Sequence, residues 1–502
     1  MRMPRTVPRR FARGASLLFA IGLALSTERP IRAQHHGLPF EPLLSPERVA
    51  ALVDALHRRL EYVPGEVLVK FQSGVTPGGQ QRALMALRSR PSIGALTWTG
   101  DVALLRDDSQ PDARILAAQL REQPEVAFAE PNYLGFSGTT PNDPGYGAQW
   151  NLSALDMPRA WDIAPGGTPD IVVAVIDNGM TTVTQTFSMP LWTGSQIQTI
   201  PVPFATNPDL TTSRFVSPRD FAFWAGPVLD MNGHATHVSG TIAQSTNNSL
   251  AEAGVAYNVS LMPVKACTGW WDVQFLMSAS GISGFAPVFS GTTCTTINTI
   301  AAIRYAADNG AKVINVSLIR FPNSAALRDA ISYAVSRGSF VAISMGNDFE
   351  NGNATNYPAA FAADIDGAMA VAAVGRSLNK AAYSNTGAYS EIAAPGGDFR
   401  DGGAAGGVVQ ETLVSSDSIP LSAAPRFDRY TPVPFQGTSM AAPHVAGAAA
   451  LVMSRMKGVT PAVVEQILRS TARDIGAPGR DPEFGFGLVQ PRAALFGLGI
   501  NR

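Results

Sequence analysis

A single serine, Ser439, stands between a Gly-Thr turn and an apolar helical stretch in the segment FQGTSMAAPHVAG, residues 435–447. Residues 439–453 are rich in Ala, Val, Leu and Met, and their one proline lies near the start, where a helix tolerates it. Ser439 is therefore predicted at a helix N-terminus, where free backbone amides and the helix dipole favour negative charge. Such a position suits either a helix cap or a nucleophile whose reaction creates an oxyanion.

A serine nucleophile needs a base, and histidine is the usual choice because its pKa lies near the operating pH. Of the six histidines in the chain, His234 and His237 lie in DMNGHATHVSG, at the start of a predicted helix. His234 is expected to face outward and His237 to turn toward neighbouring elements. His444 shares the predicted helix of Ser439 and is expected to be a packed helix residue.

A base histidine in turn needs a carboxylate that fixes its tautomer and stabilises the imidazolium. Asp177 ends the most apolar predicted strand, DIVVAVID, where a charge is costly without a partner. Asp177 is therefore a candidate for this role, and a strand-end cap that leads into the turn Asn178-Gly179 is the alternative. Spacing alone does not bring the serine, the histidine and the aspartate together.

The elements that must position these side chains are predicted from short apolar runs alternating with helical stretches. Such a pattern is typical of an α/β fold, here a doubly wound, mostly parallel sheet with helices on both faces. Asp177 and Asn347 stand at carboxyl ends of two strands, where ligands gather in such folds. Two long segments without clear periodicity, 178–218 and 397–434, are predicted to be surface loops. The predicted strands are 170–177, 260–266, 311–318, 340–346 and 368–375.

An earlier part of the chain has a different pattern. Residues 63–136 read as strand, helix, strand, helix and strand, which predicts a small α+β unit. A short helix is expected ahead of it, within residues 34–61. The stretch SGTTPNDPGYG that follows is dense in turn-forming residues and reads as an exposed linker.

Composition limits the classes of partner and the compartment. The 502 residues carry a net charge of −1, and no basic stretch interleaved with aromatics occurs, which argues against a nucleic-acid partner. Residues 1–33 run from arginine-rich through apolar to polar, the order of a secretory signal peptide, and a membrane anchor is the weaker alternative. In an exported protein the two cysteines, Cys267 and Cys294, are expected to form a disulfide rather than a metal site.

Three segments, VAVIDNG, NGHATHVSGTIA and GTSMAAPHVAG, closely resemble in this order the active-site segments of the subtilisin-like serine proteases. The resemblance implies that Asp177 orients His234, that His234 acts as general base and acid, and that Ser439 is the nucleophile. The segment SMGND is similar to the one whose asparagine donates to the oxyanion, a role that would fall to Asn347. The implied activity is that of a secreted serine endopeptidase that acts through an acyl-enzyme.

The sequence departs from the family pattern at several positions. Ala235 replaces the usual Gly, Asn178 replaces a Thr or Ser, and the catalytic residues are expected to tolerate both changes. Two segments are similar to the strands that wall the primary specificity pocket, where Ile319 and Met345 are larger than usual. We therefore expect a preference for small or medium apolar side chains. The predicted substrate-binding residues are Ser317, Leu318, Ile319, Ser344, Met345 and Gly346.

The same resemblance divides the chain into a signal peptide at 1–33, a propeptide at 34–140 and a catalytic domain at 141–502. YVPGEVLVKF and VAFAEPNY look like the ends of the family's propeptide, so the α+β unit at 63–136 is expected to be ferredoxin-like and to inhibit its own enzyme. Autocleavage is expected between about residues 132 and 145.

Two other classes of protein compete with this interpretation. An exported binding or regulatory protein on the subtilase fold with little activity is the main alternative, because a fold alone does not prove function. A lipase or esterase would carry its serine in a GxSxG elbow, whereas this serine lies in GTSMA.

Further expectations concern cofactors and partners. The chemistry requires no cofactor. Family members often bind structural calcium, and Asp143, Asp230 and Asp348 lie in suitable loops, but no contiguous ligand pattern places a metal site. A monomer in the medium or periplasm is expected, with a protein or peptide substrate and no membrane partner.

Overall fold

The structure, a computed structural model, describes residues 45–58, 60–134, 140–223, 225–283, 292–414 and 424–496. The predicted signal peptide lies outside these ranges. The chain divides into two compact units, Met1–Leu134 and Gly135–Arg502. The predicted boundary between 140 and 141 stays a prediction, because residues 135–139 are not among those described.

The N-terminal unit is an α+β fold with its own apolar core, as the periodicity of residues 63–136 predicts. Its four-stranded antiparallel sheet has the order β2-β3-β1-β4. Thr76 and Asp112 cap the two helices that pack with this sheet, each accepting a backbone amide. The prediction missed strand β2, which is four residues long. The elements are α1 (Pro46–Arg58), β1 (Tyr62–Phe71), α2 (Pro77–Leu84), β2 (Leu96–Thr99), β3 (Val102–Arg106), α3 (Ala113–Arg121) and β4 (Val126–Tyr133).

The second unit is built on a seven-stranded sheet of order β15-β14-β13-β12-β5-β9-β8, in which all neighbours are parallel. The doubly wound α/β prediction is therefore confirmed. Chain order reverses at β5, which has β9 on one side and β12 on the other; such a switch point is where ligands bind in these folds. The strands are β5 (Val172–Asp177), β8 (Arg219–Asp220), β9 (Ser260–Lys265), β12 (Val313–Val316), β13 (Phe340–Ser344), β14 (Ala368–Val374) and β15 (Ile392–Pro395).

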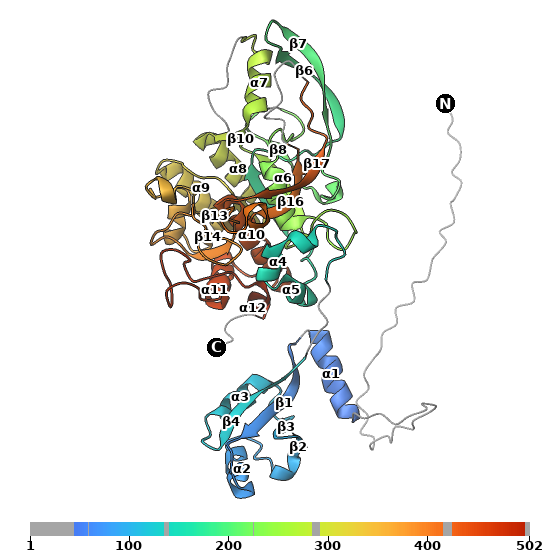
Figure 1. Ribbon diagram of the computed structural model, residues 1–502, viewed down its shortest axis with the longest axis vertical. Coiled ribbons are helices and arrows are strands. Elements are labelled where there is room, and N and C mark those ends of the chain that lie inside the picture. Colours follow the sequence, from blue (N-terminus) through green and yellow to red (C-terminus); the bar gives the residue numbers. More distant parts are fainter. Residues whose placement is uncertain are drawn as a thin grey trace, which may run out of the picture. The chain divides into compact units, whose positions relative to one another are not determined.

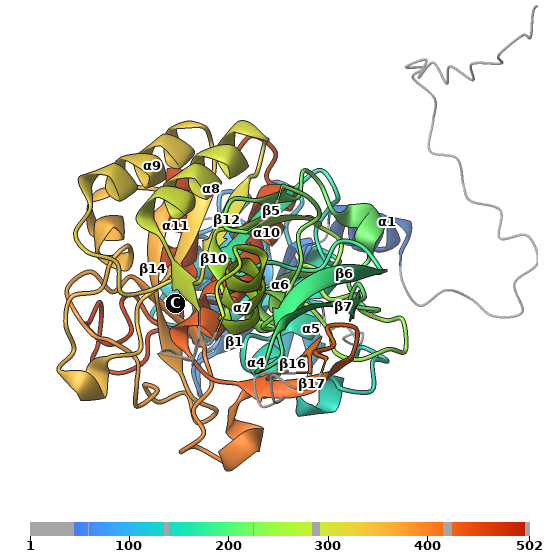
Figure 2. The same cartoon turned by 90° about the horizontal axis from the view of Figure 1, so that it is seen from above.

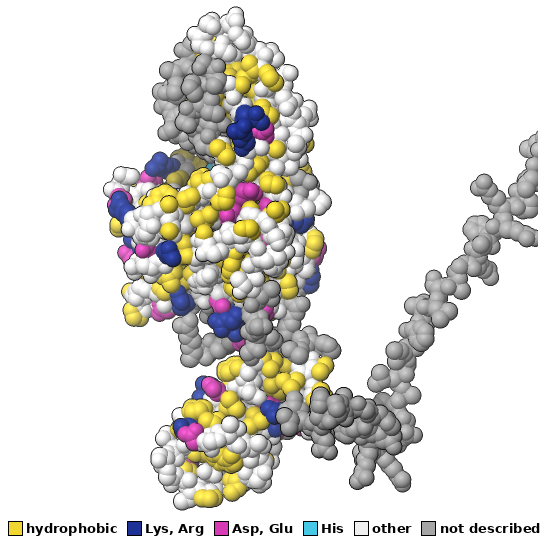
Figure 3. All heavy atoms as spheres, turned by 45° about the vertical axis from the view of Figure 1, so that its right-hand side comes forward, with side chains coloured by type: hydrophobic (Ala, Val, Ile, Leu, Met, Phe, Trp, Pro, Cys, Tyr) yellow, Lys and Arg dark blue, Asp and Glu magenta, His cyan; other side chains and the backbone are white. Residues whose placement is uncertain are grey.

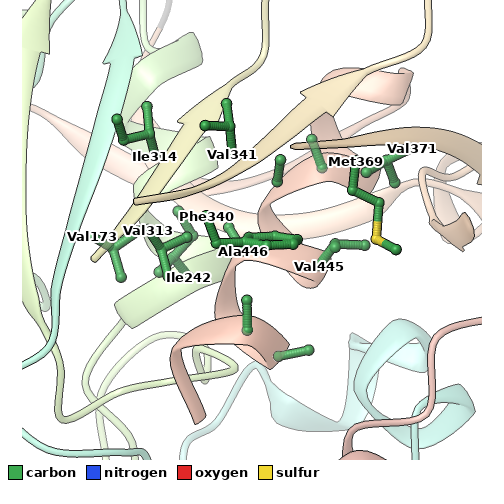
Figure 4. Packing of buried hydrophobic residues seen from close by; sticks show 14 of the residues in the cluster. Val173, Ile242, Val313, Ile314, Phe340, Val341, Met369, Val371, Val445 and Ala446 are labelled. Carbon is green, nitrogen blue, oxygen red and sulfur yellow. The ribbon is translucent and has the colours of Figure 1, made fainter. Parts of the chain in front are cut away.

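Helices cover both faces of this sheet (Figures 1 and 2). In Figure 4, Val173, Val313 and Phe340 point toward helices α6 and α10, whereas Ile314 and Val341 point to the opposite face. All five are buried, which explains why the strands read as continuous apolar runs. The helices of this unit are α4 (Trp150–Ala154), α5 (Met157–Ile163), α6 (His234–Ala243), α7 (Trp270–Ala279), α8 (Thr296–Asp308), α9 (Ala325–Ser336), α10 (Thr438–Arg455), α11 (Pro461–Thr471) and α12 (Pro491–Leu495).

Helix α10 is the central helix of the domain. Every residue from Thr438 to Ser454 is buried, and the helix packs against β5, β12, β13, β14 and β15. The packing is close, since a Cβ at Gly447 would lie 2.7 Å from a methyl group of Val255 in the loop after α6. The helix that carries Ser439 is therefore fixed by the main core.

The two segments predicted to be surface loops contain paired strands, so these predictions are wrong in part. β6 (Gln185–Trp192) pairs antiparallel with β7 (Ile197–Phe204), and β16 (Val408–Leu413) pairs antiparallel with β17 (Tyr430–Phe435). Their prolines, including Pro190 and Pro201, are tolerated because each ribbon has only two strands. Both hairpins and α7 share a second apolar cluster that includes Trp271 and Phe427.

The predicted disulfide is present, with Sγ of Cys267 bonded to Sγ of Cys294. The two cysteines are cross-strand partners in a short ribbon, formed by β10 (Cys267–Thr268) and β11 (Thr293–Cys294).

None of the helices in the described ranges is long and apolar enough to span a bilayer. On the face drawn in Figure 3, charged side chains of both signs lie in small, separate groups among the described residues.

Candidate active site

Asp177 and His234 form a hydrogen-bonded pair at the carboxyl end of β5. Asp177 is the last residue of the strand and is fully buried. Nδ1 of His234 lies 2.9 Å from both carboxylate oxygens, and the backbone amide of Asn178 donates to Oδ1 at 2.7 Å. The pair therefore selects the tautomer with a proton on Nδ1 and leaves Nε2 free to accept one.

Electrostatics favour the protonated form of this histidine. Burial lowers the pKa of His234, but the charge of Asp177, its hydrogen bond and the charge of Asp230 outweigh burial, so the pKa lies above its ordinary value. The imidazolium is thus stabilised where a general base would form it.

The loop before α6 places His234 as the first residue of that helix. Gly233 precedes it with φ +96°, a conformation that glycine adopts without strain. The buried carboxylate of Asp230 accepts from the amides of Asn232 and Gly233, each at 2.8 Å, and from Oγ1 of Thr236. These bonds fix the loop backbone that leads into the helix and carries the histidine.

Ser439 is the second residue of α10, as the sequence predicts, and is 8 % exposed. Its Oγ donates to the backbone carbonyl of Ser317 at 3.3 Å, and Oγ of Ser317 donates to the carbonyl of Ser439 at 2.8 Å. Among the described residues this carbonyl is the partner of the Ser439 hydroxyl, and His234 is not. The hydroxyl must leave Ser317 before Nε2 of the histidine can take its proton.

Asp177, His234 and Ser439 nevertheless line one cavity of about 290 Å³. The cavity opens at the switch point of the sheet, between the ends of β5 and β12. Its other walls are formed by Asn232, Thr292, Cys294, Ser317, Leu318 and Ile319.

Asn347 follows β13 and faces the loop before Ser439. Its Oδ1 accepts from both the backbone amide and Oγ1 of Thr438, each at 2.9 Å. Its Nδ2 lies 3.5 Å from the point where a Cβ of Gly437 would stand, and donates to none of the residues that the structure describes. The amide group is thus held by its oxygen while its nitrogen is available to a ligand beside the amide of Ser439.

The structure separates the two predicted walls of the specificity pocket. Ser317, Leu318 and Ile319 line the cavity, whereas Ser344, Met345 and Gly346 are not among its lining residues. Met345 is fully buried and belongs to the main apolar core. Its bulk is therefore taken up inside the domain, and Ile319 is the larger-than-usual residue that borders the cavity.

The other two histidines of the domain have structural partners, as expected. His237 is fully buried, with Nε2 beside the carbonyls of Val408 and Val433 and its ring stacked on Phe435. Burial lowers the pKa of His237 to about 3. Burial likewise lowers the pKa of His444 to about 4, and its Nδ1 donates to the carbonyl of residue 440 at 2.8 Å.

The three aspartates considered for calcium lie in separate networks. Asp143 accepts from two backbone amides of residues 247–248, Asp230 holds the loop before α6, and Asp348 pairs with Arg320. Within the described ranges, no group of three or more His, Cys, Asp or Glu side chains is arranged to hold a metal ion. These residues therefore do not fit a shared calcium site.

Sequence reasoning did not single out three residues around the site. Thr438 lies inside the GTSMAAP segment, and its position next to Ser439 was the available signal. Asn232 lies two residues before His234, a spacing typical of an Asx cap. Thr292 carries no sequence signal, because only the fold brings it to the cavity.

A doubly wound α/β domain with an Asp-His pair beside a serine at a helix N-terminus defines a serine hydrolase of the acyl-transfer class. Residues 168–487 match the model of the subtilase family, Peptidase_S8, and residues 51–132 match the fervidolysin N-terminal prodomain. The chain belongs to the subtilase family. It is a serine endopeptidase preceded by a prodomain.

Relatives support this assignment over most of the chain. A thermophilic serine proteinase of Bacillus sp. strain AK1 is 30% identical over 444 residues, which cover 88% of this chain and 90% of that protein. An extracellular protease of Xanthomonas campestris pv. campestris is 34% identical over 408 residues, covering 76% of this chain and 61% of that protein.

Solved structures have the same fold. A protease of Pseudoalteromonas arctica is 29% identical with a TM-score of 0.53, covering 71% of this chain and 99% of that one. Fervidolysin of Fervidobacterium pennivorans is 23% identical with a TM-score of 0.52, covering 87% of this chain and 61% of that one, and this likeness concerns the fold alone.

Proposed function

We propose that this protein is an exported endopeptidase that uses Ser439 as nucleophile, His234 as general base and Asp177 as the orienting carboxylate. The observation that carries the proposal is the 2.9 Å bond between Nδ1 of His234 and Asp177, in a cavity that Ser439 also lines. The order of these residues along the chain is the one that subtilisin has.

The chemistry follows from these positions. Oγ of Ser439 leaves the carbonyl of Ser317, passes its proton to Nε2 of His234 and attacks the scissile carbonyl carbon. The imidazolium is stabilised by Asp177 and gives this proton to the leaving amine, which leaves an acyl group on the serine. Water then passes a proton to His234 and attacks the acyl carbon. The bond to Oγ of Ser439 breaks, His234 returns the proton to this oxygen, and the carboxylic acid is released.

The negative oxygen of the tetrahedral intermediate needs donors that are already in place. Nδ2 of Asn347 and the backbone amide of Ser439 are our candidates. The amide of Ser439 lies in the first turn of α10, where backbone N–H groups have no partner within the helix. The positive end of this helix favours the same charge.

Substrate preference is proposed from the wall of the cavity. Ile319 borders it, and its branched side chain reduces the space for a large residue. We expect small or medium apolar side chains to precede the scissile bond. A peptide-library profile dominated by Phe, Tyr or Lys would rule this out.

Maturation is proposed to be autocatalytic, with cleavage between about residues 132 and 145 and with the propeptide acting as intramolecular inhibitor. The match to a prodomain at 51–132 supports this order. Residues 1–33 are proposed to direct export to the periplasm or the medium, where the enzyme acts as a monomer. The chemistry is proposed to need no cofactor.

Intact mass and labelling by a fluorophosphonate, which needs an activated serine, test the proposal. Wild-type protein should shorten near residue 140 after refolding and take up one label, whereas Ser439→Ala should stay whole and unlabelled. Ser454→Ala, in the last turn of the same helix, is the matched control and should behave as wild type.

Folded wild-type protein that stays whole and unlabelled would instead support a binding protein on this fold. The bond from Ser439 to the carbonyl of Ser317 is the observation that favours that alternative. Processing of Ser439→Ala at the same place, without added protease, would refute self-cleavage.

A further inference from the structure

The side chain of Asn178, which follows Asp177, connects the end of β5 with the start of α6. Asn178 is fully buried. Its Oδ1 accepts from the backbone amide of Ala235 at 3.1 Å, and its Nδ2 donates to Oδ1 of Asn232 at 2.7 Å. The same oxygen of Asn232 accepts from the backbone amide of His234 at 3.2 Å. Two asparagines thus cap the helix that carries the histidine.

The outer end of this chain of bonds is Thr292, whose Oγ1 accepts from Nδ2 of Asn178 at 3.1 Å. With Asn232 and Thr292 both accepting, Nδ2 of Asn178 has an acceptor for each of its protons. A flipped amide would turn its NH2 group toward the amide of Ala235 and place two donors face to face. The amide of Ala235 therefore selects the orientation in which Oδ1 caps α6, and Thr292 holds the nitrogen end of the side chain in place.

Thr292 is held in place by the disulfide. It directly precedes β11, and β10 and β11 are only two residues long each, too short to stay paired without another link. The bond between Cys267 and Cys294 supplies this link, and Cys267 belongs to the main core. Thr292 itself is exposed at the cavity wall, so its place depends on this anchor.

We propose that Asn178, Asn232 and Thr292 form a positioning chain that keeps His234 aligned with Asp177, and that the disulfide holds its outer end. This inference rests on the proposed function, since it assigns residues that support its catalytic pair. The three residues act through the backbone at the start of α6 and do not exchange protons with the substrate.

The kinetics distinguish a disulfide that positions Thr292 from one that only stabilises the fold. A misaligned His234 feels less of the charge of Asp177, so its pKa falls, and the acid limb of the kcat/KM profile moves to lower pH while kcat drops. Among the described residues, the charges of Asp177 and Asp230 raise the pKa of His234, and His237 is the neighbouring titratable group on α6, whose own pKa His234 lowers. A disulfide that only stabilises the fold would lower Tm and leave kcat and the acid limb unchanged.

The experiment compares mature enzymes prepared from full-length chains. Thr292→Val should lower kcat, by up to about 100-fold if the histidine moves by about 1 Å, and should shift the acid limb down. Thr292→Ser, which restores the hydroxyl, should recover both. Thr293→Val is the matched control, because this exposed neighbour bonds Thr268 through its backbone carbonyl, which the substitution keeps.

A double variant, Cys267→Ala with Cys294→Ala, should reproduce the acid-limb shift of Thr292→Val together with a lower Tm. Wild-type kcat and an unshifted acid limb in both variants would overturn the positioning chain, provided that wild type is labelled by the fluorophosphonate. A wild type that takes up no label would overturn the proposed function and, with it, this inference.

Discussion

Replacing Asn347 separates a catalytic role from a structural one, because the two ends of its amide have different partners. Oδ1 accepts both donors of Thr438, which is fully buried, while Nδ2 has no partner among the described residues. Asn347→Asp keeps an acceptor for Thr438 and removes the donor. Asn347→Ala removes both.

Both variants should lose about 100- to 1000-fold in kcat, equivalent to about 2.7 to 4 kcal/mol, a figure established on subtilisin, a member of this family. Only Asn347→Ala leaves the amide and hydroxyl of Thr438 without their partner, at a cost of about 1–3 kcal/mol in unfolding free energy. Asn347→Asp should stay near wild type in stability.

The assay is kcat per titrated active site with a chromogenic peptide, together with urea unfolding in a Ser439→Ala background that prevents autolysis. Asn353→Ala is the control, because this loop asparagine bonds Thr386 and should affect stability without affecting kcat. A kcat of Asn347→Ala within threefold of wild type would refute the donor role. Equal losses of stability in both Asn347 variants would refute the division between the two ends of the amide.

The remaining predictions concern the catalytic pair, a buried carboxyl, a core methionine and the cavity wall. Asp177→Asn should lower kcat by about 10⁴-fold, as in other enzymes with this triad, and should move the acid limb of kcat/KM to lower pH, because the aspartate raises the pKa of His234. Both oxygens of Glu252 are buried without a described partner, and burial, followed by the charges of Glu411 and Asp209, raises its pKa to about 7. Because this pKa is higher in the folded than in the unfolded state, the wild-type protein loses unfolding free energy as the pH rises through about 7. Glu252→Gln does not ionise, so in the inactive background it should exceed wild type by at most about 3 kcal/mol in unfolding free energy at pH 9 and by nothing at pH 4. Urea unfolding measures both values. Met345→Ala should lower the unfolding free energy by about 2–5 kcal/mol, whereas Ile319→Gly should broaden a peptide-library profile toward larger residues.

The sheet and the three active-site segments could be predicted because their signals are local. The five strands predicted for the sheet are continuous apolar runs, and the structure contains all of them, with bounds that differ by up to two residues at either end. The hairpin β6–β7 was missed because Pro190, Pro201 and Pro203 interrupt its alternation, which only a two-stranded ribbon tolerates. Strand β15 was not predicted because it is only four residues long.

Contacts between distant segments could not be predicted from the sequence. The hydroxyl of Ser439 bonds a carbonyl that lies 122 residues away, and no local pattern fixes that rotamer. Met345 was placed at the pocket because its segment resembles a pocket wall of the family, whereas in the structure its side chain is fully buried in the main core. Which way a residue faces just beyond a strand end depends on the elements packed there.

The burial of α10 has a consequence for the cell that makes this enzyme. Asp177 and His234 leave the ribosome well before Ser439, and the helix that carries the serine packs against five strands that lie between residues 172 and 395. An unfinished or partly folded chain therefore has no assembled nucleophile, since α10 is positioned only when the core closes around it. Proteolytic activity therefore begins only when the fold is complete. Autolysis that releases α10 from the core ends the activity and the fold together.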